Sequence, residues 1–140
     1  MALFTKASTG SPADKFEGVV DGLYVGELVG FEEGRPYVDP HTGEESPKVR
    51  WLWNLYSLDG KPVVDPATGK QRVVHEQTST KTGDRAKAPR WFEAHLNRTW
   101  SNREDLEATQ DECVGKRVML NISTKPGDGG WRKIDVFPSQ

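Results

Sequence analysis

The sequence predicts a mainly β fold, in which five strands form a small barrel and a helical insert lies between strands 3 and 4. Three observations favour it. Gly and Pro, 14 and 9 of the 140 residues, are spread as turns between short apolar runs. Residues 48–58 alternate as a strand does. Residues 88–96 instead place apolar side chains at helical spacing.

Composition indicates one folded domain over residues 16–140, preceded by a flexible, polar N-terminal arm over residues 1–15. The single cysteine, Cys113, excludes an internal disulfide and any cysteine-based zinc site. No run approaches the ~18 apolar residues of a membrane span. We therefore expect a cytoplasmic protein, in the host cell cytoplasm if the chain is viral.

The strand at 48–58 is the densest apolar segment, and we expect it at the middle of the sheet. Read at a period of two, its two faces differ in character. The core face carries Val49, Trp51, Trp53 and Leu55. The opposite face carries Arg50, Asn54 and Tyr56 beside Leu52, which suits a solvated or ligand-facing surface.

In the first half of the chain, glycine and proline residues predict where the strands bend and where the chain turns. A first strand over 16–33 contains Gly22, Gly26 and Gly30, and glycine inside a strand predicts bends of the kind that a small barrel needs. The hexapeptide at 38–43 is nearly repeated at 64–69, and its Asp-Pro start and final Gly predict two hairpin tips. Each copy offers one carboxylate, too few for calcium.

The second half predicts a third strand at 72–80, a helix at 88–96 and a second short helix whose capping box is Ser101 with Glu104. Gly115 ends the helical region. A fourth strand at 116–123 and a last strand at 131–137 flank a hairpin tip at 125–130. This is the element order of an OB-fold, a five-stranded, partly open barrel. An SH3-like barrel and a β-sandwich are the alternative layouts.

Over residues 19–138 the chain resembles phage-encoded OB-fold proteins of the single-stranded-DNA-binding type. The resemblance is carried by the segments 22–26, 49–53, 77–79, 114–118 and 131–134. It implies a DNA-binding, viral protein that acts in DNA replication or recombination. The residues themselves do not decide between DNA and RNA.

Non-specific binding of single strands needs cations for phosphates and rings on which bases stack. On the face that OB barrels use, and in the loops beside it, the candidates are Arg50, Asn54, Tyr56, Arg72, His75, Lys81, Arg85, Lys87, Lys125, Trp131, Arg132 and Lys133. Trp131 has two readings of equal weight, a stacking platform or a ring that closes the core. A block of cations over 81–103 precedes an acidic block over 104–112, which is more often a pair of solvated faces than a site.

The sequence is compared with three classes of function: a nucleic-acid-binding module, an interaction protein and an enzyme. The first is a module that binds single-stranded nucleic acid non-specifically. The alternative is a phage structural or anti-defence protein that uses the same barrel for protein contacts, with a homo-oligomer or with a host or phage protein. An enzyme is disfavoured: the three histidines have no metal-ligand spacing, and no phosphate-binding glycine loop is present. No catalytic residue, metal or cofactor is expected.

Overall fold

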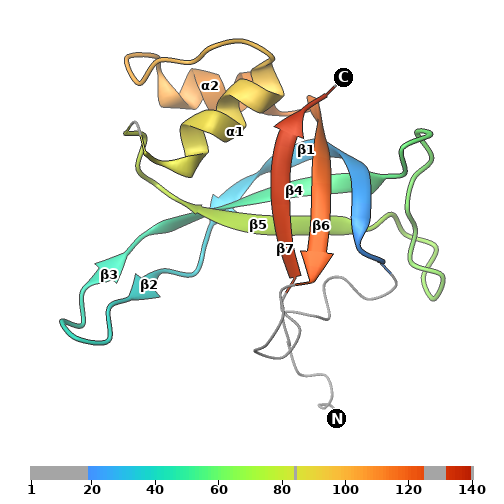
Figure 1. Ribbon diagram of the computed structural model, residues 1–140, viewed down its shortest axis with the longest axis horizontal. Coiled ribbons are helices and arrows are strands. Elements are labelled where there is room, and N and C mark those ends of the chain that lie inside the picture. The colour runs from blue at the N-terminus through green and yellow to red at the C-terminus, as the bar shows by residue number, and fades with distance from the viewer. Residues whose placement is uncertain (1–18, 84, 125–131, 140) are drawn as a thin grey trace.

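The computed structural model describes residues 19–83, 85–124 and 132–139. The elements there, in chain order, are β1 (Gly22–Glu33), β2 (Tyr37–Val38), β3 (Glu45–Ser46), β4 (Lys48–Tyr56), β5 (Val73–Ser79), α1 (Lys87–Leu96), α2 (Leu106–Cys113), β6 (Arg117–Thr124) and β7 (Arg132–Pro138) (Figure 1). The arm predicted for residues 1–15 and the hairpin tip predicted for 125–130 lie outside the described residues.

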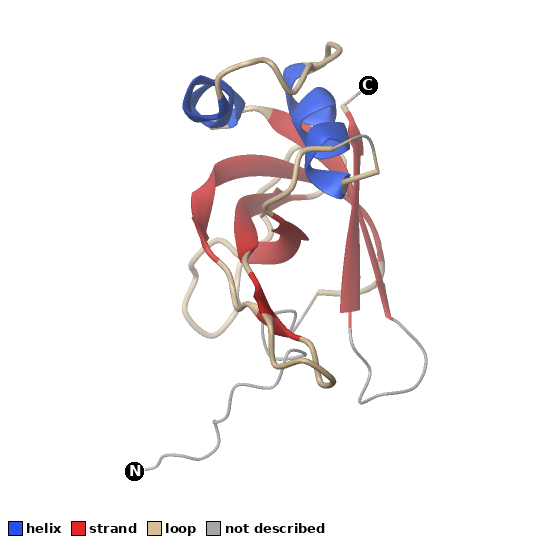
Figure 2. Cartoon of the chain, turned by 90° about the vertical axis from the view of Figure 1, so that its left-hand side faces the viewer, coloured by secondary structure: helices blue, strands red, loops and turns tan. Residues whose placement is uncertain are grey.

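Five of the strands form one antiparallel sheet in the order β5-β4-β1-β6-β7, which confirms a mainly β fold with five main strands. β2 and β3 form a separate hairpin that projects from the body of the molecule (Figure 1). Both helices come between β5 and β6 in the chain and lie together at one end of the curled sheet (Figure 2).

The two end strands of the sheet approach each other without a shared ladder among the described residues. The backbone N–H of Ile134 in β7 instead donates to the carboxylate of Glu76 in β5 at 3.1 Å. One side chain thereby links the two ends of the curled sheet.

The centre of the sheet is β1, and the expectation that residues 48–58 lie there is wrong. β1 is twelve residues long and serves two partners. Its first half pairs with β6 over Gly22–Glu27, and most of its length pairs with β4 over Val25–Glu33. β4 is therefore second in the order, between β1 and β5.

Gly26 lets the side chains of the two neighbouring strands pack closely over β1. A Cβ there would lie 2.5 Å from a methyl carbon of Leu120 and 3.1 Å from the indole of Trp53, so Leu120 would have to move to admit it. The register with β4 shifts between Leu28 and Gly30, which is the mark of a β-bulge and of a bend.

The inner face of β4 forms the core, as its alternation predicts. Trp51, Trp53 and Leu55 are each 1 % exposed or less. Two aromatic residues of α1 pack against Trp51, with ring centroids at 5.2 Å for Trp91 and 5.3 Å for Phe92. Among the described residues, neither helix is long and apolar enough to cross a membrane.

His95 of α1 fixes the position of the Trp53 indole through a hydrogen bond. The Trp53 indole N–H can only donate, so the His95 Nε2 at 2.9 Å accepts and the ring proton sits on Nδ1. That Nδ1 donates to the Trp91 carbonyl at 2.7 Å. Burial lowers the pKa of His95 to about 4, because a charged imidazolium would lose its hydration in the core.

Both copies of the hexapeptide form hairpin tips, as predicted. Asp39 accepts a hydrogen bond from the backbone N–H of His41 at 2.8 Å, and Asp65 accepts one from Ala67 at 2.9 Å. The closing glycines, Gly43 and Gly69, have φ of 73° and 72°. These values lie in the left-handed region that glycine tolerates best.

The second helix begins later than predicted. Its N-cap is Asp105, whose carboxylate accepts from the Ala108 N–H at 2.8 Å. Only the Glu104 half of the predicted capping box forms: its carboxylate accepts from the Ser101 N–H at 3.0 Å, whereas the Ser101 hydroxyl accepts from the Arg103 N–H. These residues form a turn ahead of α2, and Glu104 also pairs with Arg98 at 3.1 Å. Arg98 also pairs with Glu112 at 3.3 Å. The basic and acidic blocks thus neutralise each other at this corner.

Replacing Trp53 by Ala should lower the free energy of unfolding by ~3–5 kcal/mol, because it leaves a cavity and removes the donor to His95. Urea denaturation measures the change. Arg50→Ala, on the outer face of the same strand, is the control and should change stability by no more than about 1 kcal/mol. A stable Trp53→Ala variant would mean that the two faces of β4 are assigned the wrong way round.

Acid should destabilise the fold through His95. The unfolded chain takes up a proton near pH 6.5, whereas the folded chain does so only near pH 4, so the free energy of unfolding falls as the pH drops through this window. Between pH 7 and pH 5 the loss should be about 2 kcal/mol. A His95→Gln variant keeps an acceptor for Trp53 and cannot titrate. If it loses as much stability as the wild type over this range, the loss does not come from His95.

Candidate nucleic-acid interface

The outer face of β4 carries the side chains that the sequence places there. Arg50, Asn54 and Tyr56 are half-buried and alternate with the core residues. His75 of β5 lies on the same face, because it is the register partner of Leu52. The fold therefore brings four of the predicted residues onto one surface.

Arg50 is already neutralised on this surface. Its guanidinium Nη1 lies 2.7 Å from the carboxylate of Glu32 in β1, and the two residues are register partners. The Arg50 Nε is buried and has no hydrogen-bond partner among the described residues. A phosphate reaching Arg50 would have to compete with Glu32 for the guanidinium.

Tyr56 is held by two further strands. The guanidinium of Arg117 in β6 stacks on its ring, 4.4 Å from the centroid. The Tyr56 hydroxyl donates to Glu27 of β1 at 3.3 Å, and Arg117 pairs with the same carboxylate at 3.5 Å. One face of the ring is therefore occupied by a cation rather than free for a base.

Two other predicted cations also face carboxylates. Arg72 lies 3.9 Å from Asp65, and its side chain is only 15 % exposed. Lys133 pairs with Asp135 at 3.5 Å on β7. The candidates on the strands thus contribute little free positive charge.

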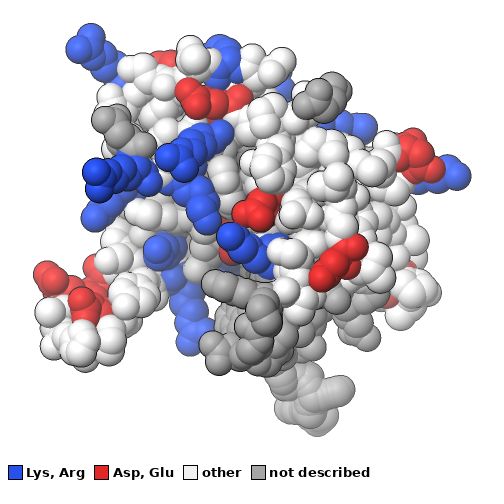
Figure 3. All heavy atoms as spheres, viewed as in Figure 1, with Lys and Arg blue, Asp and Glu red and all other residues white. Residues whose placement is uncertain are grey.

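The cations that follow β5, up to the first residue of α1, differ from those on the strands because they face no carboxylate among the described residues. Lys81, Arg85 and Lys87 are exposed, and none of them forms an ion pair within the described part of the chain. Lys87 lies 5.6 Å from the ring centre of Trp91. Arg90, which the sequence reasoning left out, is exposed on the next turn of α1. Figure 3 shows Lys and Arg side chains gathered over this segment and the adjoining part of the sheet.

Three of the predicted site residues have side chains outside the part of the chain that the structure describes. Lys125 and Trp131 lie outside the described residues, and so does the side chain of Arg132. The two readings of Trp131, stacking platform and core ring, therefore both stand.

Sequence reasoning missed Glu27, Glu32 and Arg117, the partners of the outer-face residues. Strict alternation puts Glu27 and Glu32 on opposite faces of β1, since they are five residues apart. The bulge between Leu28 and Gly30 returns both to the outer face. The only signal in the sequence is Gly30 itself, which marks a bulge without saying what it brings together.

The groups that could carry chemistry are separated. No cluster of three or more His, Cys, Asp or Glu that could hold a metal ion occurs among the residues that the structure describes. Cys113 is buried, and burial raises the pKa of its thiol to about 12. Such a thiol is protonated at neutral pH and is a poor nucleophile.

Neither of two sequence comparisons assigns the chain to a family. No protein-family model matches it, and no curated protein is found to match it. Its function is therefore inferred from its own residues and their geometry.

Proposed function

We propose that this protein is an OB-type module that binds single-stranded nucleic acid without sequence specificity, and that it is not an enzyme. The observation that carries the proposal is the group of exposed cations that follows β5, Lys81, Arg85 and Lys87, which form no ion pair with another described residue. Arg90 extends this group, and we call the four residues the basic segment.

The layout of the sheet supports an OB-type barrel. An OB-fold is a five-stranded, partly open barrel. Here the five strands follow the order β5-β4-β1-β6-β7, and a hydrogen bond from the Ile134 N–H to the Glu76 carboxylate links the end strands. The helices enter the chain between the third and fourth strands of this sheet. OB-folds bind oligonucleotides on the face of their second and third strands, which correspond to β4 and β5.

The charge distribution supports local rather than bulk attraction. The net charge is −2, so the molecule as a whole does not attract a polyanion. Cations that already face carboxylates, such as Arg50 and Lys133, gain less from a phosphate than free ones do. We therefore assign the phosphate contacts to the basic segment. Phage DNA replication or recombination, in a host cytoplasm, is the setting we propose.

The salt dependence of binding tests this function. With one phosphate contact from each of Lys81, Arg85 and Lys87, a plot of log K against log salt concentration should have a slope of about −2 for a single strand. We expect Lys81→Ala, Arg85→Ala and Lys87→Ala, combined in one variant, to abolish most of this slope and to weaken binding roughly tenfold or more at low salt. Fluorescence anisotropy of a labelled oligodeoxythymidylate measures both quantities.

A control variant separates position from net charge. Lys61→Ala, Lys70→Ala and Lys116→Ala remove the same charge from exposed residues outside the basic segment. This control should keep the wild-type slope. Wild-type protein that shows no salt-sensitive binding at micromolar concentration would contradict the proposed function.

One observation favours a second function, protein–protein contact. Val25, Met119 and Phe137 are register neighbours across β1, β6 and β7 and form an apolar row on the outer face. Phe137 is 47 % exposed. Under this function the row joins two copies of the chain, so light scattering should report a dimer for the wild type and a monomer for Phe137→Ser. A monomeric wild type would exclude self-association through this row.

A further inference from the structure

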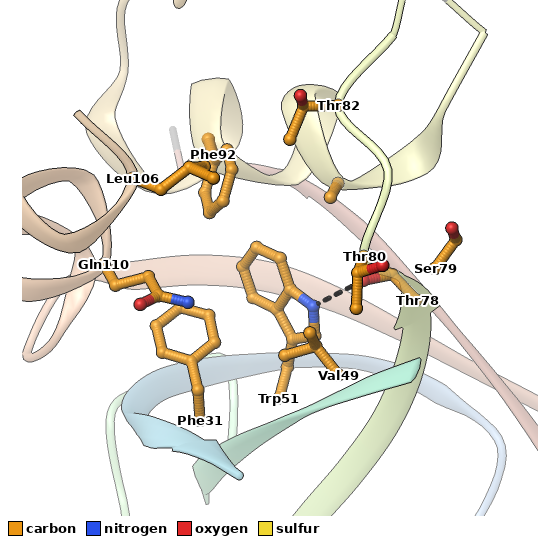
Figure 4. A pocket seen from close by; sticks show the side chains of 11 residues that line it. Phe31, Val49, Trp51, Thr78, Ser79, Thr80, Thr82, Phe92, Leu106 and Gln110 are labelled. Atoms are coloured by element: carbon orange, nitrogen blue, oxygen red, sulfur yellow. Dashed lines mark hydrogen bonds between the residues drawn. The ribbon is translucent and has the colours of Figure 1, made fainter. Parts of the chain in front are cut away.

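A pocket of about 190 Å³ opens between the sheet and the two helices, beside the basic segment (Figure 4). Its lining comes from β1, β4, β5, α1, α2 and the residues that follow β5. The pocket is smaller than the 300–1,000 Å³ typical of sites for drug-sized ligands. It therefore has room for one ring system rather than for an extended molecule.

The inner wall of the pocket is aromatic. Phe31 meets Trp51 edge to face with ring centroids 4.8 Å apart, and Phe92 lies 5.3 Å from the same indole. The Trp51 indole N–H is already bonded to Thr78 at 2.9 Å. Phe31 is the partly exposed ring of this wall, with Trp51 and Phe92 buried behind it, and the wall requires no hydrogen bond from whatever enters.

The rim of the pocket carries polar side chains that form no hydrogen bond with other described residues. The side chains of Thr80, Thr82 and Gln110 line the pocket, and none of them makes a hydrogen bond to another described residue. Figure 4 shows Gln110 and the two threonines on opposite sides of the aromatic rings. An amide that both donates and accepts, in a lining that also includes two threonines, matches the mixed donors and acceptors on the edge of a nucleobase.

Cations alternate with the lining residues along the chain. Lys81 lies between Thr80 and Thr82, and Lys87 directly precedes Ala88, which also lines the pocket. Two exposed cations therefore directly adjoin, in the chain, residues that line an aromatic pocket. An apolar protein side chain would use the aromatic wall and leave these cations without partners. A nucleotide uses both.

We propose that this pocket accepts one unstacked base of a single-stranded nucleic acid, while Lys81 and Lys87 contact the phosphates on either side of that base. The inference rests on the proposed function and adds a specific base subsite to it. The subsite lies at the helical end of the sheet, apart from the outer face of β4.

Two pocket variants test the subsite. Thr82→Trp places a ring at the mouth, and Gln110→Leu keeps the volume of the side chain and removes its hydrogen-bonding groups. Both should weaken binding of a labelled oligodeoxythymidylate in fluorescence anisotropy, by about tenfold for Thr82→Trp, which is within the range for losing one stacked base. The salt slope should stay at the wild-type value, because the phosphate contacts are unchanged. Ala108→Leu, on an exposed position of α2 that does not line the pocket, is the matched control and should bind as the wild type does.

Photo-cross-linking gives a readout that does not depend on affinity. An oligonucleotide carrying 5-iodouracil should cross-link to Phe31, Trp51 or Phe92, as mapped by mass spectrometry of the full-length protein. Salt-sensitive binding with both pocket variants at wild-type affinity, or with cross-links only outside the pocket, overturns the subsite and leaves the proposed function standing. Absence of binding by the wild type overturns the proposed function itself.

Discussion

Burying an indole ring requires a hydrogen-bond acceptor for its N–H, and this requirement positions both helices. The Trp53 N–H is accepted by His95 of α1, and the Trp100 N–H by Thr109 of α2 at 2.9 Å. Neither acceptor belongs to the sheet. The first bond joins α1 to the sheet, and the second joins α2 to the segment that follows α1, so both helices complete the core chemically as well as filling space above it.

The cations fall into two groups. Those on the strands form ion pairs with carboxylates, and those that follow β5 form none with another described residue. Cations on the strands face acidic neighbours set by the register, as Arg50 faces Glu32. Residues after β5 have left the ladder and have no such neighbour in the described chain, so Lys81 and Lys87 stay unpaired. Free positive charge thus collects where a strand ends, in residues that adjoin the lining of the aromatic pocket in the chain.

The features of the fold that depend only on residues close together in the chain could be predicted from the sequence. The alternation of β4 placed Trp51 and Trp53 in the core, and the Asp-Pro turns formed as their residues require. Long-range pairings were out of reach. That β1 would be central, that a bulge would set Glu32 beside Arg50, and that Gln110 would meet Phe31 all depend on segments far apart in the chain. The start of α2 was misjudged because Ser101 and Glu104 close a separate turn, and Asp105 supplies the N-cap of the helix.

The link between Glu76 and the Ile134 amide has a mechanical consequence. Hydrogen bonds to charged groups contribute about 1.5–3 kcal/mol each, so parting the two end strands costs one such bond instead of a whole ladder. Fewer backbone hydrogen bonds therefore hold the two end strands to each other than hold β4, β1 and β6 together, among the described residues.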